Sequence, residues 1–202
     1  DVVTSTTHKT LRGPRAGIIF CKKQYEKLIN ESVFPSLQGG PHEHQIAAIA
    51  TQLKQVAKPE FKTYIKQVKI NAQMLANELI KRDYKVCSGG TDNHIVLIDL
   101  NNKNITGSKI EKLCELVNIS INKNSVPGDK SALSPGGIRL GTPSLTTRGM
   151  NKEHMIQVAD YLDRVVKLAL EIQDKDCKKL KDFINFIETD NSTILKINKI
   201  KN

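Results

Sequence analysis

A short polar segment near the start of the chain combines residue types that suit carbonyl chemistry. It runs from His8 to Arg15 and places Lys9 beside a histidine and close to two arginines. Neighbouring cations lower the pKa of a lysine, and the neutral amine is the form that gives a Schiff base with an aldehyde. The segment therefore indicates Lys9 as a nucleophile, with a solvated basic loop as the alternative.

Two segments flank this loop and are expected to position it. Residues 2–7 are β-branched or small, and residues 16–21 are mainly apolar, so both are predicted to be buried strands. The loop between them would then lie at the ends of strands in a sheet, with a site beside it.

The remaining elements are predicted from apolar spacing and from turn and capping residues. A turn at 38–41 precedes one helix, and Pro59 begins a long helix whose apolar seam reaches Leu79. Ser108 and Glu111 have the spacing of a capping box, and Asn151 is expected to cap a last long helix. The predicted later strands are residues 84–88, 94–100, 119–122 and 137–141.

These elements suggest two parts joined near the long helix. Residues 1–83 would supply strands to a larger sheet together with the linking helix, and residues 84–187 would form a compact α+β domain. Residues 188–202 are expected to be a frayed tail.

Composition restricts the classes of function. The chain has 202 residues, 39% hydrophobic and 26% charged, which is typical of a globular protein. No apolar run approaches the roughly 20 residues of a membrane span. The four cysteines form no CxxC pair, and His42 and His44 are expected to diverge on a helix, so no metal site is predicted. The chain starts at Asp1 without Met and is interpreted as a fragment.

The net charge of +10 admits a nucleic-acid-binding fragment as an alternative. The lysines are spread along the whole chain, aromatic residues make up only 4%, and Trp is absent, so stacking platforms for single strands are scarce. A basic surface that attracts small anions fits better, and neither a nucleic-acid nor a membrane partner is expected.

Four segments, in order, resemble the serine hydroxymethyltransferase family. The run from Thr6 to Arg15 resembles the signature around the family's cofactor lysine, and Gln38-Gly39-Gly40-Pro41 resembles its glycine pair. Residues 91–94 resemble the turn before a small-domain strand, and residues 122–149 resemble the substrate end of the site. The resemblance extends over about residues 1–187.

The resemblance implies an α/β fold of the fold type I transferases that depend on pyridoxal 5'-phosphate (PLP). This chain would supply part of the large domain and a C-terminal α+β small domain. Lys9 would bind PLP covalently, with His8 and Thr6 as further catalytic residues. The implied cofactor-binding residues are Lys9, Thr7, His8, Gly39, Gly40 and Arg15; the implied substrate-binding residues are Arg139, Asn124, Ser131, Ala132 and Leu133.

Two of these assignments also have a physical rationale. Only glycine lets backbone N–H groups approach a phosphate as closely as Gly39 and Gly40 would, although a plain helix-entry turn is the alternative. Arg139 lies in an otherwise apolar strand and would bind the substrate carboxylate bidentately if it were buried; an outward strand position is the alternative. The triplet 131–133 departs from the Ser-Pro-Phe of bacterial relatives.

The implied reaction is the interconversion of serine and glycine with one-carbon transfer to the co-substrate tetrahydrofolate. The implied assembly is a homodimer, or a dimer of dimers, with the site shared across the interface. The expected location is cytoplasmic, with a mitochondrial location as the alternative. Because other family site residues belong to the N-terminal half, this chain alone is expected to be inactive. Another fold type I PLP enzyme, an aminotransferase or a folate-independent aldolase, is the competing reading, and a structural or regulatory remnant is a further alternative.

Overall fold

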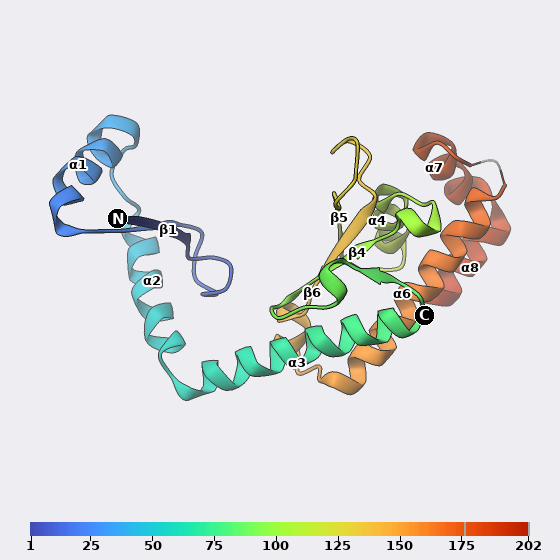
Figure 1. Ribbon diagram of the computed structural model, residues 1–202, viewed down its shortest axis with the longest axis horizontal. Coiled ribbons are helices and arrows are strands. Elements are labelled where there is room, and N and C mark those ends of the chain that lie inside the picture. The colour runs from blue at the N-terminus through green and yellow to red at the C-terminus, as the bar shows by residue number, and fades with distance from the viewer. Residues whose placement is uncertain (176, 202) are drawn as a thin grey trace. The chain divides into compact units, whose positions relative to one another are not determined.

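The computed structural model describes residues 1–175 and 177–201 (Figure 1). The chain divides into two compact units, unit 1 from Asp1 to Thr63 and unit 2 from Tyr64 to Asn202. No helix among the described residues is both long and apolar enough to cross a membrane.

Unit 1 contains a β-ribbon followed by helices. Strand β1 (Val2–Thr6) pairs antiparallel with β2 (Gly17–Cys21), and the loop with Lys9 joins them. Both strands were predicted, but the expectation that they are buried is wrong for this chain, because Val3 is 62% exposed and Phe20 is 58% exposed. Within unit 1 Thr7 is the one buried residue, so the ribbon has no apolar layer packed against it there.

The rest of unit 1 is helical. A 3-10 turn, η1 (Lys23–Tyr25), leads to α1 (Glu26–Glu31) and to the π-helix η2 (Ser32–Leu37), none of which was predicted. Helix α2 (Glu43–Val56) follows the glycine pair, as predicted. Helix α3 (Pro59–Lys81) begins at Pro59, also as predicted, and continues into unit 2.

Unit 2 contains a four-stranded antiparallel sheet in the order β3-β4-β6-β5. Its strands are β3 (Lys85–Val86), β4 (Ile95–Asp99), β5 (Asn122–Asn124) and β6 (Gly137–Gly141). Val96 and Ile98 of β4 pair with Leu140 and Ile138 of β6, and all four are buried. This face of the sheet contributes to the core of the unit.

Helices complete the core on that face. They are α4 (Gly107–Leu116), α5 (Pro143–Thr147), α6 (Lys152–Gln173), α7 (Leu180–Thr189) and α8 (Asn191–Lys201), with short 3-10 turns η3 (Cys87–Gly89) and η4 (Asn101–Lys103). Figure 1 shows α4, α6, α7 and α8 gathered beside the sheet. Leu75 of α3, Leu113 of α4 and Phe183 of α7 are each at most 1% exposed.

The two compact units divide inside α3, between Thr63 and Tyr64, and the sequence placed the boundary inside or just after this helix, at residue 83. Val68, Ala72, Leu75 and Leu79 are buried, because the predicted apolar seam of α3 packs into the core of unit 2. The same seam that identified the helix thus also assigns most of it to the C-terminal unit.

Three local predictions need correction. Strand β5 occupies residues 122–124 and not 119–122, and only Lys85 and Val86 of the predicted 84–88 strand pair in the sheet. Thr106, not Ser108, is the residue at the N-terminal end of α4, and it makes no side-chain capping bond. The Glu111 carboxylate instead accepts a hydrogen bond from the Lys123 N–H at 2.9 Å and so attaches β5 to α4.

The end of the chain also differs from the expectation. Residues 188–202 were expected to fray, whereas Asn191–Lys201 form α8, with Thr193 and Ile197 buried. Asp190 begins this helix by accepting a hydrogen bond from the Thr193 N–H at 2.8 Å. At α6 the prediction was correct, since Asn151 and His154 form a capping box.

Candidate functional site

The loop that carries Lys9 is closed by hydrogen bonds of the buried residue Thr7. The N–H of Thr7 donates to the Ala16 carbonyl at 3.1 Å, and its hydroxyl donates to the Pro14 carbonyl at 2.6 Å. In return, the Thr7 carbonyl accepts from the Gly13 N–H at 2.7 Å. Thr7 therefore fixes both ends of the loop and holds its neighbours at the end of the ribbon.

Inside this loop a tight turn presents the lysine. The Arg12 N–H donates to the Lys9 carbonyl at 2.9 Å, and Arg12 has a φ of 56°. A Cβ on Gly13 would lie 2.9 Å from the Thr7 carbonyl oxygen, so the close approach requires glycine. Lys9 itself is exposed, so its amine is accessible to a group bound outside the loop.

His8 has an unusual environment beside the lysine. Its Nδ1 is buried and has no hydrogen-bond partner among the described residues. Most buried polar atoms in proteins have a hydrogen-bond partner, so a group from outside the described residues is a natural partner for this nitrogen. Thr6 lies at the end of β1 opposite Gly17 and is half-buried, and Arg15 is exposed.

The glycine pair precedes α2 in irregular chain. A Cβ on Gly39 or on Gly40 would meet no atom within 4 Å, and neither residue has a left-handed φ. Nothing within this structure therefore requires glycine at either position. The nearby rings of His42 and His44 do not diverge as expected but stack at 5.4 Å, because His42 precedes α2 in extended conformation.

In unit 2, Arg139 lies on the exposed side of β6. Its neighbours Ile138 and Leu140 are buried, and Arg139 alternates with them and is exposed. It is opposite Leu97 of β4 and Asn122 of β5. Of the two alternatives left open by the sequence, a buried and an outward Arg139, the structure has the outward one. Arg139 is therefore available to an external anion and needs no internal counter-charge.

The loop from residue 124 to 136 holds the other predicted substrate contacts. Asn124 ends β5 opposite Gly137, and its amide donates to the Ser125 carbonyl at 2.7 Å. The triplet Ser131, Ala132 and Leu133 is exposed, and Leu133 reaches 93%. The Ser131 hydroxyl accepts from the Leu133 N–H at 3.2 Å, which shapes the tip of the loop.

The predicted residues thus form two groups. Lys9, His8, Thr6, Thr7, Arg15, Gly39 and Gly40 belong to unit 1. Arg139, Asn124 and the 131–133 triplet belong to unit 2, where β5 and β6 bring Asn124 and Arg139 onto adjacent strands.

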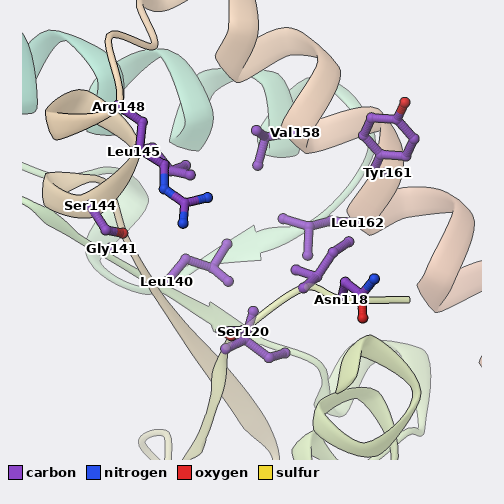
Figure 2. A pocket seen from close by; sticks show the side chains of 12 residues that line it. Asn118, Ser120, Leu140, Gly141, Ser144, Leu145, Arg148, Val158, Tyr161 and Leu162 are labelled. Atoms are coloured by element: carbon purple, nitrogen blue, oxygen red, sulfur yellow. The ribbon is translucent and has the colours of Figure 1, made fainter. Parts of the chain in front are cut away.

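A separate pocket of about 470 Å³ lies in unit 2 (Figure 2). None of the predicted site residues lines it. Figure 2 shows Arg148 extending from the end of α5 toward Leu140, with Leu145, Val158 and Leu162 around the cavity. Sequence reasoning missed this pocket, because its apolar lining comes from residues that read as ordinary core positions.

Comparison with known proteins places the chain in a family. The family model for serine hydroxymethyltransferase matches residues 1–162. The chain is 48% identical to "Serine hydroxymethyltransferase, cytosolic" of Candida albicans, over 96% of the chain and 45% of that protein. It is 51% identical to the serine hydroxymethyltransferase of Plasmodium falciparum, over 91% of the chain and 42% of that protein.

A plant relative agrees with these two. "Serine hydroxymethyltransferase 4" of Arabidopsis thaliana is 50% identical, over 91% of the chain and 42% of that protein. The chain therefore spans less than half the length of these curated relatives. The matches extend over nearly the whole chain and include both groups of predicted site residues. The chain belongs to the serine hydroxymethyltransferase family.

Proposed function

We propose that this chain works as the C-terminal half of a PLP-dependent enzyme that interconverts serine and glycine with transfer of a one-carbon unit to tetrahydrofolate. The observation that carries the proposal is the identity of about 50% to serine hydroxymethyltransferases across both units. We call a polypeptide that joins these residues to the segments that the relatives have outside the match the complete enzyme.

Three features of unit 1 fit a bound PLP. Lys9 presents an exposed amine on a loop that Thr7 fixes at both ends. The Nδ1 of His8 is buried without a partner among the described residues. The structure of the chain itself does not require glycine at positions 39 and 40. This favours an external group, such as a phosphate, that needs close access to the backbone of Gly39 and Gly40.

When bound, PLP would supply the electron sink for cleavage at the amino-acid substrate. Lys9 would hold it covalently through Nζ, and the same amine could accept or return a proton once the substrate displaces it. His8 and Thr6 would line the pocket around the lysine. Arg15 would contribute positive charge nearby, and the fixed loop would keep these groups in one orientation.

The residues of unit 2 would bind the substrates. The Arg139 guanidinium would bind the carboxylate of serine or glycine through two hydrogen bonds and so orient the bonds at Cα. Asn124 and the exposed triplet 131–133 would contact the pterin of tetrahydrofolate. No step in this scheme requires a metal ion as cofactor.

The proposed assembly is a homodimer or a dimer of dimers. The backbone N–H groups of Gly39 and Gly40 would reach the cofactor phosphate of the neighbouring subunit, as the family resemblance implies. We further propose a cytoplasmic location, since the Candida albicans relative is named cytosolic. Mitochondrial and chloroplastic relatives also carry the family name, so the location does not follow from family membership alone.

The relatives do not favour the competing enzyme classes. Those compared above all carry the name serine hydroxymethyltransferase, and none is named as an aminotransferase or an aldolase. An enzyme of those classes would cleave or transaminate its substrate without folate, so dependence of serine cleavage on tetrahydrofolate separates the alternatives.

The test of this function replaces Arg139 in the complete enzyme and measures folate-dependent serine turnover. Arg139→Ala should raise the KM for serine about 10- to 100-fold, because charge-assisted hydrogen bonds are worth about 1.5–3 kcal/mol. Arg139→Lys should restore little, since an ammonium lacks the bidentate fork.

Arg164→Ala, on α6, serves as the control and should leave the KM for serine unchanged. An unchanged KM for serine in Arg139→Ala would contradict the role of this arginine. Turnover of serine that does not depend on tetrahydrofolate would contradict the proposed reaction.

A further inference from the structure

The loop proposed to meet tetrahydrofolate is closed at its base by one carboxylate. Asp129 accepts hydrogen bonds from the Gly136 N–H at 2.8 Å and from the Val126 N–H at 3.0 Å, both on Oδ2. Its Oδ1 accepts from the Asn101 side-chain amide at 3.1 Å. The Asp129 side chain thus ties the first stem of the loop, at Val126, and the second stem, at Gly136, to η4, which follows β4.

The first stem is fixed by a turn where the Asp129 carboxylate binds it. Val126 and Asp129 enclose a turn with Pro127 and Gly128 in the middle, closed by a hydrogen bond from the Asp129 N–H to the Val126 carbonyl at 3.1 Å. Gly128 has a φ of 95°, as a type II turn demands at this position. The turn aims the Asp129 carboxylate at the opposite stem.

The opposite stem has no room for a side chain. A Cβ on Gly136 would lie 2.4 Å from the Asn101 Oδ1 and 2.5 Å from the Asp129 Oδ1. The Gly136 carbonyl accepts from the Leu100 N–H at 2.9 Å, and the Pro135 carbonyl accepts from the Gly107 N–H at 2.8 Å. The base of the loop is therefore fixed to β4 and α4.

The tip between these stems is, in contrast, exposed. Ser131 to Ser134 are all exposed. Within this tip the Leu133 N–H donates to the Ser131 hydroxyl, and the Ser134 N–H donates to the Ser131 carbonyl. An exposed apolar side chain such as Leu133 gains nothing from folding unless a ligand or partner covers it. The structure thus combines a fixed base with a tip that is open to a ligand.

We propose that Asp129 is a positioning residue for the folate co-substrate, holding the 131–133 triplet and Asn124 in the arrangement that receives the pterin. Asn124 is included because it pairs with Gly137, and Gly137 follows Gly136, whose N–H donates to the Asp129 carboxylate. The hydrogen bonds from Gly136, Val126 and Asn101 also hold the pKa of Asp129 below its ordinary value, so the carboxylate stays charged near neutral pH. This inference rests on the proposed function.

The test compares Asp129→Ala and Asp129→Asn in the complete enzyme loaded with PLP. Asp129→Ala should raise the KM for tetrahydrofolate at least about ten-fold, while the KM for serine and the amount of bound PLP change less than two-fold. Asp129→Asn should have a smaller effect in the same direction, because an amide oxygen can still accept from the two stem N–H groups. Asp160→Ala, an exposed carboxylate on α6, is the matched control.

A second variant keeps the test decisive if Asp129→Ala fails to fold. Asn101→Ala removes one hydrogen bond from the carboxylate without touching Asp129, and should raise the KM for tetrahydrofolate by a few-fold. A KM for tetrahydrofolate within two-fold of the unsubstituted enzyme in both Asp129→Asn and Asn101→Ala would overturn the proposal. So would parallel losses of serine affinity, bound PLP and folate affinity, which indicate a general structural role.

Failure of the proposed function would look different. An unsubstituted complete enzyme that binds no PLP, or that turns over serine without tetrahydrofolate, refutes the proposed reaction before any variant is compared. If the enzyme is active and folate-dependent but its KM for tetrahydrofolate does not change when Asp129 is substituted, only the positioning role is refuted.

Discussion

At the scale of single residues, the chain combines exposed reactive groups with residues whose hydrogen bonds fix the backbone around them. Lys9 and Arg139 are both exposed, as groups that meet external substrates must be. Thr7 and Asp129, in contrast, satisfy backbone N–H and carbonyl groups around them. The residues expected to meet substrate and the residues that fix their loops are therefore different residues, which can be tested separately.

The cysteines give a residue-scale prediction that is independent of catalysis. Burial raises the pKa of Cys114 to about 12, and its side chain is fully buried on α4. Since the thiolate is the reactive form, we expect Cys114 to resist iodoacetamide at pH 8 until urea unfolds unit 2. Peptide mapping after alkylation measures this directly.

The control for this experiment is Cys114→Ser, which should remove the label that appears in urea and leave the others. Alkylation of Cys114 at pH 8 in the absence of urea, at a rate similar to that of a free thiol, would mean that α4 is not packed as described.

Several candidate site positions stand out in the sequence because their motifs are local. Lys9 and its neighbours occupy one continuous loop, and Gly39 and Gly40 are adjacent. The Asp129 network could not be predicted in the same way, since it joins Asn101, Val126 and Gly136 across distant positions. A lone Asp after Pro-Gly reads as an ordinary turn residue until the strands bring its partners together.

At the scale of elements, long periodic segments were predicted best. The apolar seam of α3 was identified correctly, because a buried stripe repeats over many turns. Strands β1, β2, β4 and β6 were also predicted to within one residue at each end. The bounds of the shortest strands, β3 and β5, were wrong, and β5 shows the reason. Asn122–Asn124 is polar, and it is a strand because it pairs with β6 and because Glu111 binds its backbone.

Helix α3 is held to α5 and to the start of α6 by one buried amide. Asn71 is fully buried, and its Nδ2 donates to the Thr146 hydroxyl and to the Met150 carbonyl, both at 2.9 Å. Asn71→Ala should lower the free energy of unfolding by about 1–3 kcal/mol, because it leaves buried acceptors unpaired. Urea denaturation followed by circular dichroism measures the change.

The matched control is Asn77→Ala on the exposed side of the same helix, which should change the stability by less than about 0.5 kcal/mol. Equal effects of the two substitutions would show that the Asn71 bonds contribute no specific stability.

At the scale of the whole molecule, the two units differ in how much of a core each contains. In unit 1 only Thr7 is buried among the described residues, whereas unit 2 buries apolar side chains from its sheet and from five helices, α3, α4, α6, α7 and α8. The exposed apolar side chains of β1 and β2 are what a strand pair shows when the rest of its sheet is supplied elsewhere.

This difference gives a physical reason for the expected inactivity of the 202-residue chain by itself. Lys9, the lysine proposed to bind PLP, lies in the unit without an apolar core, and the chain spans 45% of its Candida albicans relative. The sequence could not indicate this difference, because the apolar residues of β1 and β2 read as core whether or not their covering layer is present.

The most direct test of the account is to map the lysine that binds PLP. The complete enzyme and the 202-residue chain are incubated with PLP, reduced with borohydride and digested, and the modified peptide is identified by mass spectrometry. We expect a pyridoxyl label on Lys9 in the complete enzyme, absent from its Lys9→Gln variant, and little or no label in the chain alone. A complete enzyme that carries its label on another lysine, or none, would contradict the central claim and leave the His8–Arg15 segment as a solvated basic loop.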